Sequence, residues 1–375
     1  MSSSPKIILL GPASPYRGGI ADTQDALYKA LKKLGVEIEL ITFKTLYPQL
    51  LFPGKSPLRE DANEKQSYLR LLHTYNPLFW WKCAQWINTQ EATAVVVRYW
   101  TPFVALSWWG LRKFLKPNIK MIGMVDNWTP HESKPFDRAL RRLFEKSCSC
   151  FISLSENVGK QIAKDTTKKV AQGFHPIAND LPAPIPQNEA RKRLGLPETI
   201  KIIAFVGLIR KYKGISLLLD SFAAALKKDA NLFLSISGEF YTDQKATFEK
   251  ITSLGIEEQV HVHPKFLSAE KMRDYICAAD IIAQPYIKAT QSGITPLAYF
   301  YEKPLLVSAV EGLQDPILKD GTGKAAIRTT SAWTSAILEM LKEKDTAFYT
   351  SALQKVKNKY QWEQFAKLLL ELSSD

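Results

Sequence analysis

Short runs of aliphatic and β-branched residues alternate along the chain with longer stretches whose apolar positions recur at helical spacing. This alternation is typical of βαβ units, in which helices connect parallel strands. The runs in the first half predict strands at residues 6–11, 36–43, 94–98, 120–125 and 150–154. The runs in the second half predict strands at residues 200–206, 232–237, 260–262, 281–284 and 305–308.

Helical periodicity fills most of the intervals between these strands. It predicts helices at residues 21–34, 102–115, 134–146, 156–164, 215–227, 245–254, 269–278, 294–301 and 362–373. Residues 44–72, which include FPGKSP and a run of charges, predict a long loop instead. Residues 175–186 hold four prolines, which lack a backbone N–H and resist helix formation. This segment predicts a linker between two domains.

We therefore predict an α/β protein made of two doubly wound, Rossmann-like domains with parallel sheets. The first domain would span residues 1–176 and the second residues 177–360, a division that suits a chain of 375 residues. Ligands of such sheets bind at the carboxyl ends of the strands, so a cleft between the two domains is the expected site.

The composition is that of a globular protein, with 46% hydrophobic and 23% charged residues. Four cysteines provide no disulfide framework, which favours a reducing, cytoplasmic compartment. The apolar run before Gly11 is too short for a signal peptide, and no stretch approaches the roughly 20 apolar residues of a membrane span. His261 and His263 alternate on a predicted strand without carboxylate partners, so no metal site is expected.

The net charge of +13 is unevenly distributed. The first 185 residues contain 25 Lys and Arg against 15 Asp and Glu, which predicts anionic partners for this half. No helix-turn-helix, zinc-finger or RRM signature is present, so nucleic acid is not expected. Trp100, Phe103, Trp108 and Trp109 precede a basic stretch at 112–116, which suits peripheral contact with an anionic membrane. A core-facing helix explains the same aromatics, and we favour it.

Three segments follow predicted strands and lead into predicted helices. In GPASPYRGGIAD, residues 11–22, the pair Gly18 and Gly19 leaves backbone N–H groups free at a helix start, without the GxGxxG fingerprint of NAD-binding proteins. In FVGLIRKYKG, residues 205–214, the cations Arg210 and Lys213 are placed to neutralise a diphosphate. In residues 284–298, Ser292, Gly293 and Ile294 stand at a helix start, where amides can receive phosphate oxygens.

Each of these features also has a purely structural explanation. The first loop could be a turn that needs positive φ, the second a solvated basic loop, and the third the start of an ordinary capped helix. Asp126, at a strand end, is either a carboxylate that binds a ligand hydroxyl or the cap of the next turn. His131 either contacts a ligand or belongs to a turn. The order of the three loops favours phosphate binding over three unrelated turns.

With its loops in this order, the chain resembles the GT-B glycosyltransferases of family 4, also called group 1. The resemblance rests on RGGIAD, G-x-x-R-x-x-K-G, S-G-I and GLQDPILKDGTG, with NPLFWWK and NWTPHE between them, and it extends over nearly the whole chain. It implies two Rossmann-like domains facing a cleft, the first on the acceptor side and the second binding a nucleotide-sugar. It also implies that the last helix, within residues 361–375, packs back on the first domain.

The resemblance further implies roles for individual residues. One set would hold the donor diphosphate: Gly18, Gly19, Arg210, Lys213, Ser292, Gly293 and Ile294. A second set would frame the nucleoside: Gly238, Glu239 and Phe266. Asp126 and His131 would act on the reacting sugars as catalytic residues. No metal or other cofactor is implied, because the cationic side chains neutralise the diphosphate in place of a metal ion.

The function that the resemblance implies is a retaining glycosyltransferase. It would move a sugar from a nucleotide-sugar donor to a glycan or lipid-linked acceptor in cell-surface polysaccharide synthesis. The leaving diphosphate would serve as the base toward the acceptor hydroxyl. We expect a cytoplasmic protein in peripheral contact with the inner face of the plasma membrane.

Two alternatives remain open. Many members of the family carry a Glu-x7-Glu pair. This chain has Ala289 and Leu297 at the corresponding positions, or Thr290 and Ala298 after a shift of one residue, and none of these is acidic. A non-catalytic, carbohydrate-binding relative would explain that difference. A sugar-nucleotide epimerase on the same fold is the other alternative, and it would need carboxylate or histidine groups for acid–base chemistry around the sugar.

Overall fold

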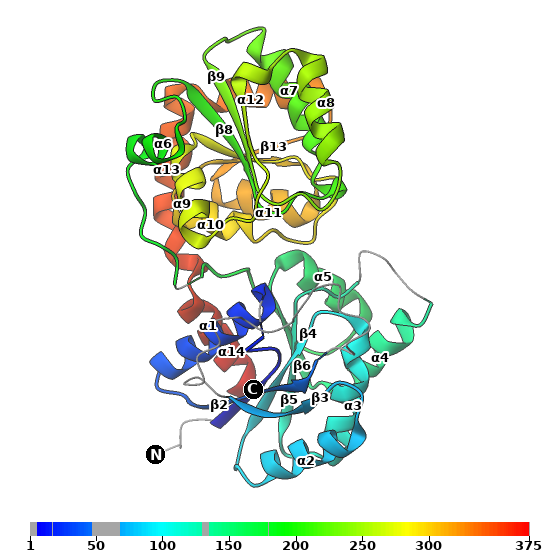
Figure 1. Ribbon diagram of the computed structural model, residues 1–375. Helices are drawn as coiled ribbons and strands as arrows, with labels where there is room; N and C mark the ends of the chain where they lie inside the picture. Colours follow the sequence, from blue (N-terminus) through cyan, green and yellow to red (C-terminus); the bar gives the residue numbers. More distant parts are fainter. Residues whose placement is uncertain (1–5, 17, 47–67, 130–134, 179, 375) are drawn as a thin grey trace. The chain divides into compact units, whose positions relative to one another are not determined.

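Every strand in the described part of the chain is paired in parallel, and the strands form two separate sheets (Figure 1). The computed structural model describes residues 6–16, 18–46, 68–129, 135–178 and 180–374. The chain divides into an N-terminal unit, Met1–Pro176 with Gln361–Asp375, and a C-terminal unit, Ile177–Tyr360. The predicted α/β class with two doubly wound parallel sheets is confirmed.

The N-terminal unit has a seven-stranded sheet in the order β3-β2-β1-β4-β5-β6-β7. Its strands are β1 (Lys6–Leu10), β2 (Glu37–Thr45), β3 (Leu69–His73), β4 (Ala94–Tyr99), β5 (Lys120–Val125), β6 (Cys150–Ser153) and β7 (Val170–Gln172). Its helices are α1 (Gly19–Lys33), α2 (Pro77–Asn88), α3 (Ala105–Phe114), α4 (Asp137–Ser147), α5 (Glu156–Asp165) and α14 (Trp362–Ser374). Residues of α2 to α5 form one core cluster and residues of α1 and α14 another, so helices cover both faces of the sheet.

Helix α14 completes the core of the N-terminal unit, although it follows the whole C-terminal unit in the sequence. Trp362, Phe365 and Leu369 are fully buried and share a core cluster with residues of α1. Their spacing of three and four residues puts them on one face of the helix. The chain thus crosses between the units twice, and the N–H of Ile177 donates a 2.7 Å hydrogen bond to the carbonyl of Tyr360.

The C-terminal unit has a six-stranded sheet in the order β10-β9-β8-β11-β12-β13. Its strands are β8 (Lys201–Val206), β9 (Leu232–Ser237), β10 (Val260–His263), β11 (Ile281–Gln284), β12 (Leu305–Ser308) and β13 (Gly323–Ala326). Its helices are α6 (Gln187–Leu194), α7 (Ile215–Leu226), α8 (Gln244–Leu254), α9 (Ala269–Ala278), α10 (Ile294–Phe300), α11 (Glu311–Asp320), α12 (Thr330–Met340) and α13 (Glu343–Val356). Both sheets are wound in the same way. The chain first adds strands outward on one side of the first strand and then returns to add strands outward on its other side.

The predicted strands agree with the observed ones to within two residues. Three strands at sheet edges were not predicted, namely β3, β7 and β13, nor were the helices α2, α6, α11, α12 and α13. The predicted loop at 44–72 is wrong at both ends, because β2 continues to Thr45 and β3 begins at Leu69. Residues 47–67 lie outside the described residues. Edge strands are half-buried and short, so they lack the continuous apolar run that identifies a central strand. None of the helices formed by the described residues combines the length and the hydropathy that a membrane span requires.

We expect Leu369→Ala to lower the free energy of unfolding of the N-terminal unit by about 2–5 kcal/mol, because it leaves a cavity beneath α14. Urea unfolding, followed by circular dichroism, measures this loss. Lys367→Ala is the matched control on the exposed side of the same helix and should change the stability by less than about 0.5 kcal/mol. Equal stabilities of the two variants would contradict the packing of α14 in this core.

Candidate functional site

The strand order identifies the place where the C-terminal sheet can bind a ligand. The chain winds from β8 through β9 to β10 and then returns to the other side of β8 with β11. The connections that leave the carboxyl ends of β8 and β11 therefore run to opposite sides, and doubly wound sheets bind ligands in the space between such connections. In this unit those connections begin with residues 207–214 and 285–293.

Lys213 lies at this point, and its side chain is folded back into the protein. It ends a short 3-10 turn, after which Gly214, at φ +69°, leads directly into α7. A side chain at position 214 has no room, because its β-carbon would lie 2.1 Å from the carbonyl oxygen of Pro285. This tight turn places Lys213 Nζ 5.0 Å from the ring centre of Tyr286 and 5.9 Å from that of Phe205.

Among the described residues, no carboxylate pairs with the buried ammonium group of Lys213. The residue is 8% exposed, and none of the ion pairs between described residues includes it. Burial lowers the pKa of Lys213 below that of an ordinary lysine; Tyr212 opposes this shift and the charge of Arg210 adds to it. An anion bound at Nζ would be attracted strongly, because water screens little in a buried site.

Tyr286 connects Lys213 to the start of α10. The Tyr286 hydroxyl lies 3.3 Å from Ser292 Oγ, which accepts a hydrogen bond from the N–H of Ile294, also at 3.3 Å. A β-carbon at Gly207 would lie 3.1 Å from Ile294 Cδ1 and 3.6 Å from Lys213 Nζ. The structure therefore brings three predicted site residues, Lys213, Ser292 and Ile294, together around the glycine that ends β8. Gly293, between the last two, is exposed.

The end of β9 runs directly beside the end of β8. Gly238, at φ +145°, fits only as glycine, because a β-carbon there would lie 2.1 Å from the carbonyl oxygen of Gly207. The N–H of Ile209 donates a 2.8 Å hydrogen bond to the carbonyl of Glu239, whose side chain is half-buried. The predicted nucleoside residues Gly238 and Glu239 therefore border the loop that carries Lys213.

Arg210 and Phe266 lie on the outside of the unit. The guanidinium carbon of Arg210 is 4.8 Å from the ring centre of Tyr241, and Arg210 lines a hollow of about 530 Å³ that does not include Lys213, Ser292 or Ile294. Phe266 follows β10 and is 74% exposed. Arg210 and Lys213 are three residues apart in sequence, yet their side chains have different surroundings.

A buried ion pair lies at the corresponding point of the N-terminal unit, where the winding changes sides between β1 and β4. Arg98, on β4, donates two hydrogen bonds of 2.5 Å to the carboxylate of Asp126, which follows β5. Arg98 also donates to Gln24 Oε1 and Thr23 Oγ1 of α1, at 3.3 and 2.9 Å. The predicted catalytic residue Asp126 is 6% exposed, and both of its carboxylate oxygens bond to Arg98.

Sequence reasoning missed Arg98. It is the one charge in the apolar run AVVVRY, and a charge in a buried strand needs a partner on a neighbouring element. That signal could have paired it with Asp126. Gly18 and Gly19 lie exposed at the start of α1, and a β-carbon at either would meet no atom within 4 Å. His131 lies outside the described residues.

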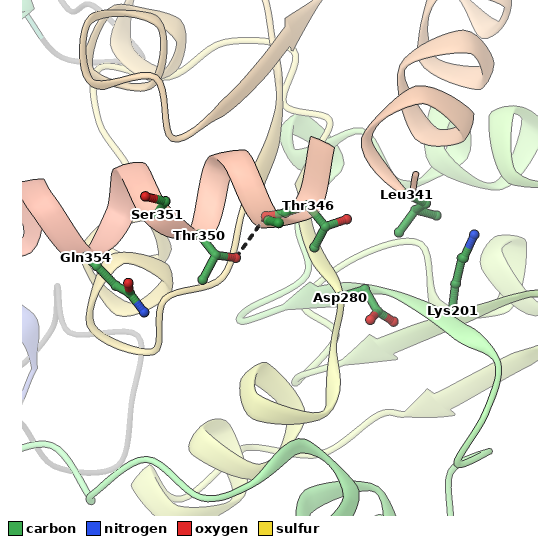
Figure 2. A pocket seen from close by; sticks show the side chains of 8 residues that line it. Lys201, Asp280, Leu341, Thr346, Thr350, Ser351 and Gln354 are labelled. Carbon is green, nitrogen blue, oxygen red and sulfur yellow. Dashed lines mark hydrogen bonds between the residues drawn. The ribbon is translucent and has the colours of Figure 1, made fainter. Parts of the chain in front are cut away.

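A second hollow of the C-terminal unit, of about 560 Å³, lies beside α13 (Figure 2). Asp280 faces it, but this carboxylate already accepts hydrogen bonds from the N–H of Ile202 and from Arg191, at 2.6 and 2.8 Å. The hollow lies at the amino ends of β8 and β11, opposite to the end where such sheets bind ligands. In the described part of the chain, no group of three or more His, Cys, Asp or Glu residues could hold a metal ion.

The C-terminal half of the sequence matches a known family, the glycosyl transferases group 1, over residues 186–362. A D-inositol 3-phosphate glycosyltransferase 1 from Catenulispora acidiphila is 30% identical over 152 residues, 38% of this chain and 36% of that protein. A D-inositol 3-phosphate glycosyltransferase from Rhodococcus jostii is 23% identical over 333 residues, 84% of this chain and 68% of that protein. The chain spans less than half the length of the first three relatives it matches.

Solved structures share the fold over nearly the whole chain. Anabaena Alr3699/HepE, in complex with UDP and glucose, has a TM-score of 0.71 at 16% identity and aligns with 98% of this chain and 99% of its own. The lipopolysaccharide outer core galactosyltransferase WaaB has a TM-score of 0.69 at 12% identity, with 98% and 99% coverage. These likenesses establish the GT-B fold. The resemblance to the glycosyl transferases group 1 is thus supported by the family match over residues 186–362 and by relatives that are glycosyltransferases.

Proposed function

We propose that the chain is a retaining glycosyltransferase that moves a sugar from a nucleotide diphosphate-sugar to a glycan or lipid-linked acceptor. The observation that carries this proposal is Lys213, a buried cation with no ion-pair partner among the described residues. It lies at the carboxyl ends of β8 and β11, where doubly wound sheets bind nucleotides. The diphosphate of a donor would supply the missing negative charge.

In the proposed reaction, the bond between sugar C1 and the diphosphate oxygen breaks, and negative charge develops on the leaving diphosphate. The Lys213 ammonium stabilises that charge, and its effect is larger in a buried site than in water. The acceptor hydroxyl forms the new bond to C1 on the same face of the sugar, and its proton passes to the leaving diphosphate. A glycine at position 207 keeps side-chain atoms away from Lys213 Nζ, which lies 3.6 Å from the β-carbon position there.

The other predicted site residues are proposed to have different roles. Ser292 and the amide of Gly293 are proposed to contact the diphosphate from the α10 side, whereas the amide of Ile294 already bonds to Ser292 Oγ. Arg210 and Phe266, which are both exposed, are proposed to contact the donor from the outside, beside Gly238 and Glu239. We propose Asp126 as a positioning residue, because it holds the Arg98 side chain that contacts α1. Gly18, Gly19 and His131 remain predictions for this function.

Two similar proteins suggest the acceptor class. One relative in sequence is a D-inositol 3-phosphate glycosyltransferase, and one solved structure of the same fold is a lipopolysaccharide outer core galactosyltransferase. The excess of basic residues in the first 185 positions suits an acceptor that carries phosphate. We therefore propose a glycan or lipid-linked acceptor of cell-surface polysaccharide synthesis, used in the cytoplasm.

Binding of a nucleotide diphosphate tests the role of Lys213. We expect UDP or GDP to bind the protein in calorimetric titrations, and Lys213→Met to weaken that binding at least about tenfold, because a charge-assisted contact is lost. Lys211→Met is the matched control, since Lys211 is exposed in the same turn, and it should bind as the parent does.

The same variant should also change stability. Lys213→Met replaces a buried charge, which has no ion-pair partner in the described part of the chain, with an apolar side chain. We therefore expect the free energy of unfolding to rise by about 1 kcal/mol or more. A parent protein that binds no nucleotide diphosphate, or a Lys213→Met variant that binds equally well, would overturn the proposed site.

The pH dependence of nucleotide binding provides an independent test. Binding favours the ammonium form of Lys213, and burial lowers the pKa of that group in the free protein. The affinity should therefore fall as the pH rises through this lowered pKa, by about tenfold per pH unit above it. Lys213→Arg stays charged throughout, so its affinity should not show this fall. The affinity ratio of parent to variant at each pH, measured by calorimetry, cancels the titration of the nucleotide itself.

Real-time NMR of a nucleotide-sugar incubated with the protein distinguishes the three candidate activities. A retaining transferase should release, by slow hydrolysis, a sugar whose first-formed anomer matches the configuration of the donor. Release of the opposite anomer would contradict retention. An epimerised donor would indicate the epimerase, and an unchanged donor despite nucleotide binding would favour the non-catalytic relative suggested by Ala289 and Leu297.

A further inference from the structure

Large apolar side chains stand exposed on two neighbouring helices of the N-terminal unit. On α2, Leu78 is 53% and Trp81 45% exposed; on α3, Leu106 is 45% and Trp109 38% exposed. Soluble proteins expose single apolar residues commonly, but clusters of them with tryptophan mark interaction surfaces. This cluster has no role in the proposed transfer reaction.

The four side chains point the same way, because both helices cover the same face of the sheet. The opposite side of α2, with Cys83, Ala84 and Ile87, and that of α3, with Trp108 and Leu111, belong to a single core cluster. Each exposed pair has the i, i+3 spacing that aligns side chains on one side of a helix. Both exposed sides therefore face away from the sheet.

Close packing joins the two helices into one surface. Trp80 of α2 lies directly over Gly110 of α3, where a β-carbon would come within 2.1 Å of the indole ring. A glycine at this position lets the two helix backbones approach each other. The exposed residues of α2 and α3 thus form a continuous patch, which we call the α2–α3 face: Leu78, Trp81, Lys82, Leu106, Trp109 and Lys113.

The charge on the α2–α3 face is entirely positive. Neither helix contains Asp or Glu, whereas Lys82 and Lys113 are exposed among the apolar residues. Lys113 Nζ lies 5.5 Å from the ring centre of Trp109. The neighbouring helix α4 adds exposed Arg138, Arg142 and Lys146, spaced four residues apart along one side.

We propose that the α2–α3 face docks the N-terminal unit on an anionic lipid bilayer. Tryptophan and leucine side chains enter the boundary between headgroups and acyl chains, and the lysines contact the lipid phosphates. A positively charged face complements such a bilayer, and each lysine near its surface adds to the attraction. The same charge opposes docking of a second copy, because two basic faces would meet. The proposal does not depend on the transferase function.

The aromatic residues that precede the basic stretch at 112–116 differ in burial. Trp108 is fully buried, and Trp100 and Phe103 pack partly buried against the same cluster. The core interpretation is therefore correct for these three. Trp109 is turned outward, and the other exposed members of the face, on α2 and at Leu106, were not singled out from the sequence.

Co-sedimentation with vesicles tests the proposal on the full chain. Vesicles of phosphatidylcholine with about 30 mol% phosphatidylglycerol should bind the protein, and pure phosphatidylcholine vesicles should bind it at least about tenfold more weakly at physiological salt. The double variants Trp81→Ser with Trp109→Ser and Lys82→Glu with Lys113→Glu should each lose about tenfold or more in partitioning.

Matched controls lie on the C-terminal unit. Lys227→Glu with Lys228→Glu makes the same charge change at exposed positions, and Phe348→Ser removes an aromatic ring that is 64% exposed. Both should partition as the parent does. Unchanged melting temperatures and nucleotide binding would show that all variants are folded, so that a loss of lipid binding is separate from any failure of the proposed transferase function.

Bromine-labelled lipids report insertion directly. They should quench part of the tryptophan fluorescence of the parent, and this part should disappear in the Trp81→Ser, Trp109→Ser variant. Equal binding to neutral and anionic vesicles, no binding, or binding unaffected by the two double variants would overturn the proposal. So would a dimer, detected by light scattering, that these variants dissociate, because a second copy would then occupy the face.

Discussion

Parallel pairing of β8 with both β9 and β11 is the constraint on which the rest of the C-terminal unit depends. A parallel pair cannot be closed by a hairpin, so each connection must cross a face of the sheet. When the winding changes sides at β8, the connections diverge and leave the ends of two strands uncovered. Gly207, Lys213 and the start of α10 meet at these ends because the topology brings their loops to one place.

Two buried cations in this protein have opposite surroundings. Arg98 donates hydrogen bonds to Asp126, Gln24 and Thr23, so it stabilises the arrangement of β4, β5 and α1 without any ligand. Lys213 is nearly as buried, but aromatic rings rather than carboxylates surround its ammonium group. A buried charge without its partner costs stability unless a ligand supplies that partner. The contrast distinguishes a structural charge from one suited to bind an anion.

The central strands could be predicted from the sequence because both of their faces are buried, which leaves a continuous apolar run such as IIAFV in β8. The edge strands β3, β7 and β13 lack such runs, and helices such as α6, with the sequence QNEARKRL, carry few apolar residues. Lys213, Ser292 and Ile294 could be placed in one site because their loops follow neighbouring strands. The separation of Arg210 from Lys213 could not be predicted, since it depends on which way each side chain leaves a turn.

The position of α14 has a consequence for synthesis on the ribosome. The C-terminal unit is one continuous segment, whereas the N-terminal unit needs residues that are translated after Tyr360. Until Trp362, Phe365 and Leu369 emerge, one face of the first sheet lacks part of its apolar cover, so the unit made first is completed last. The N-terminal unit therefore remains incomplete while the C-terminal unit is synthesised and folds. Domains usually complete their folding in order from the amino end of the chain.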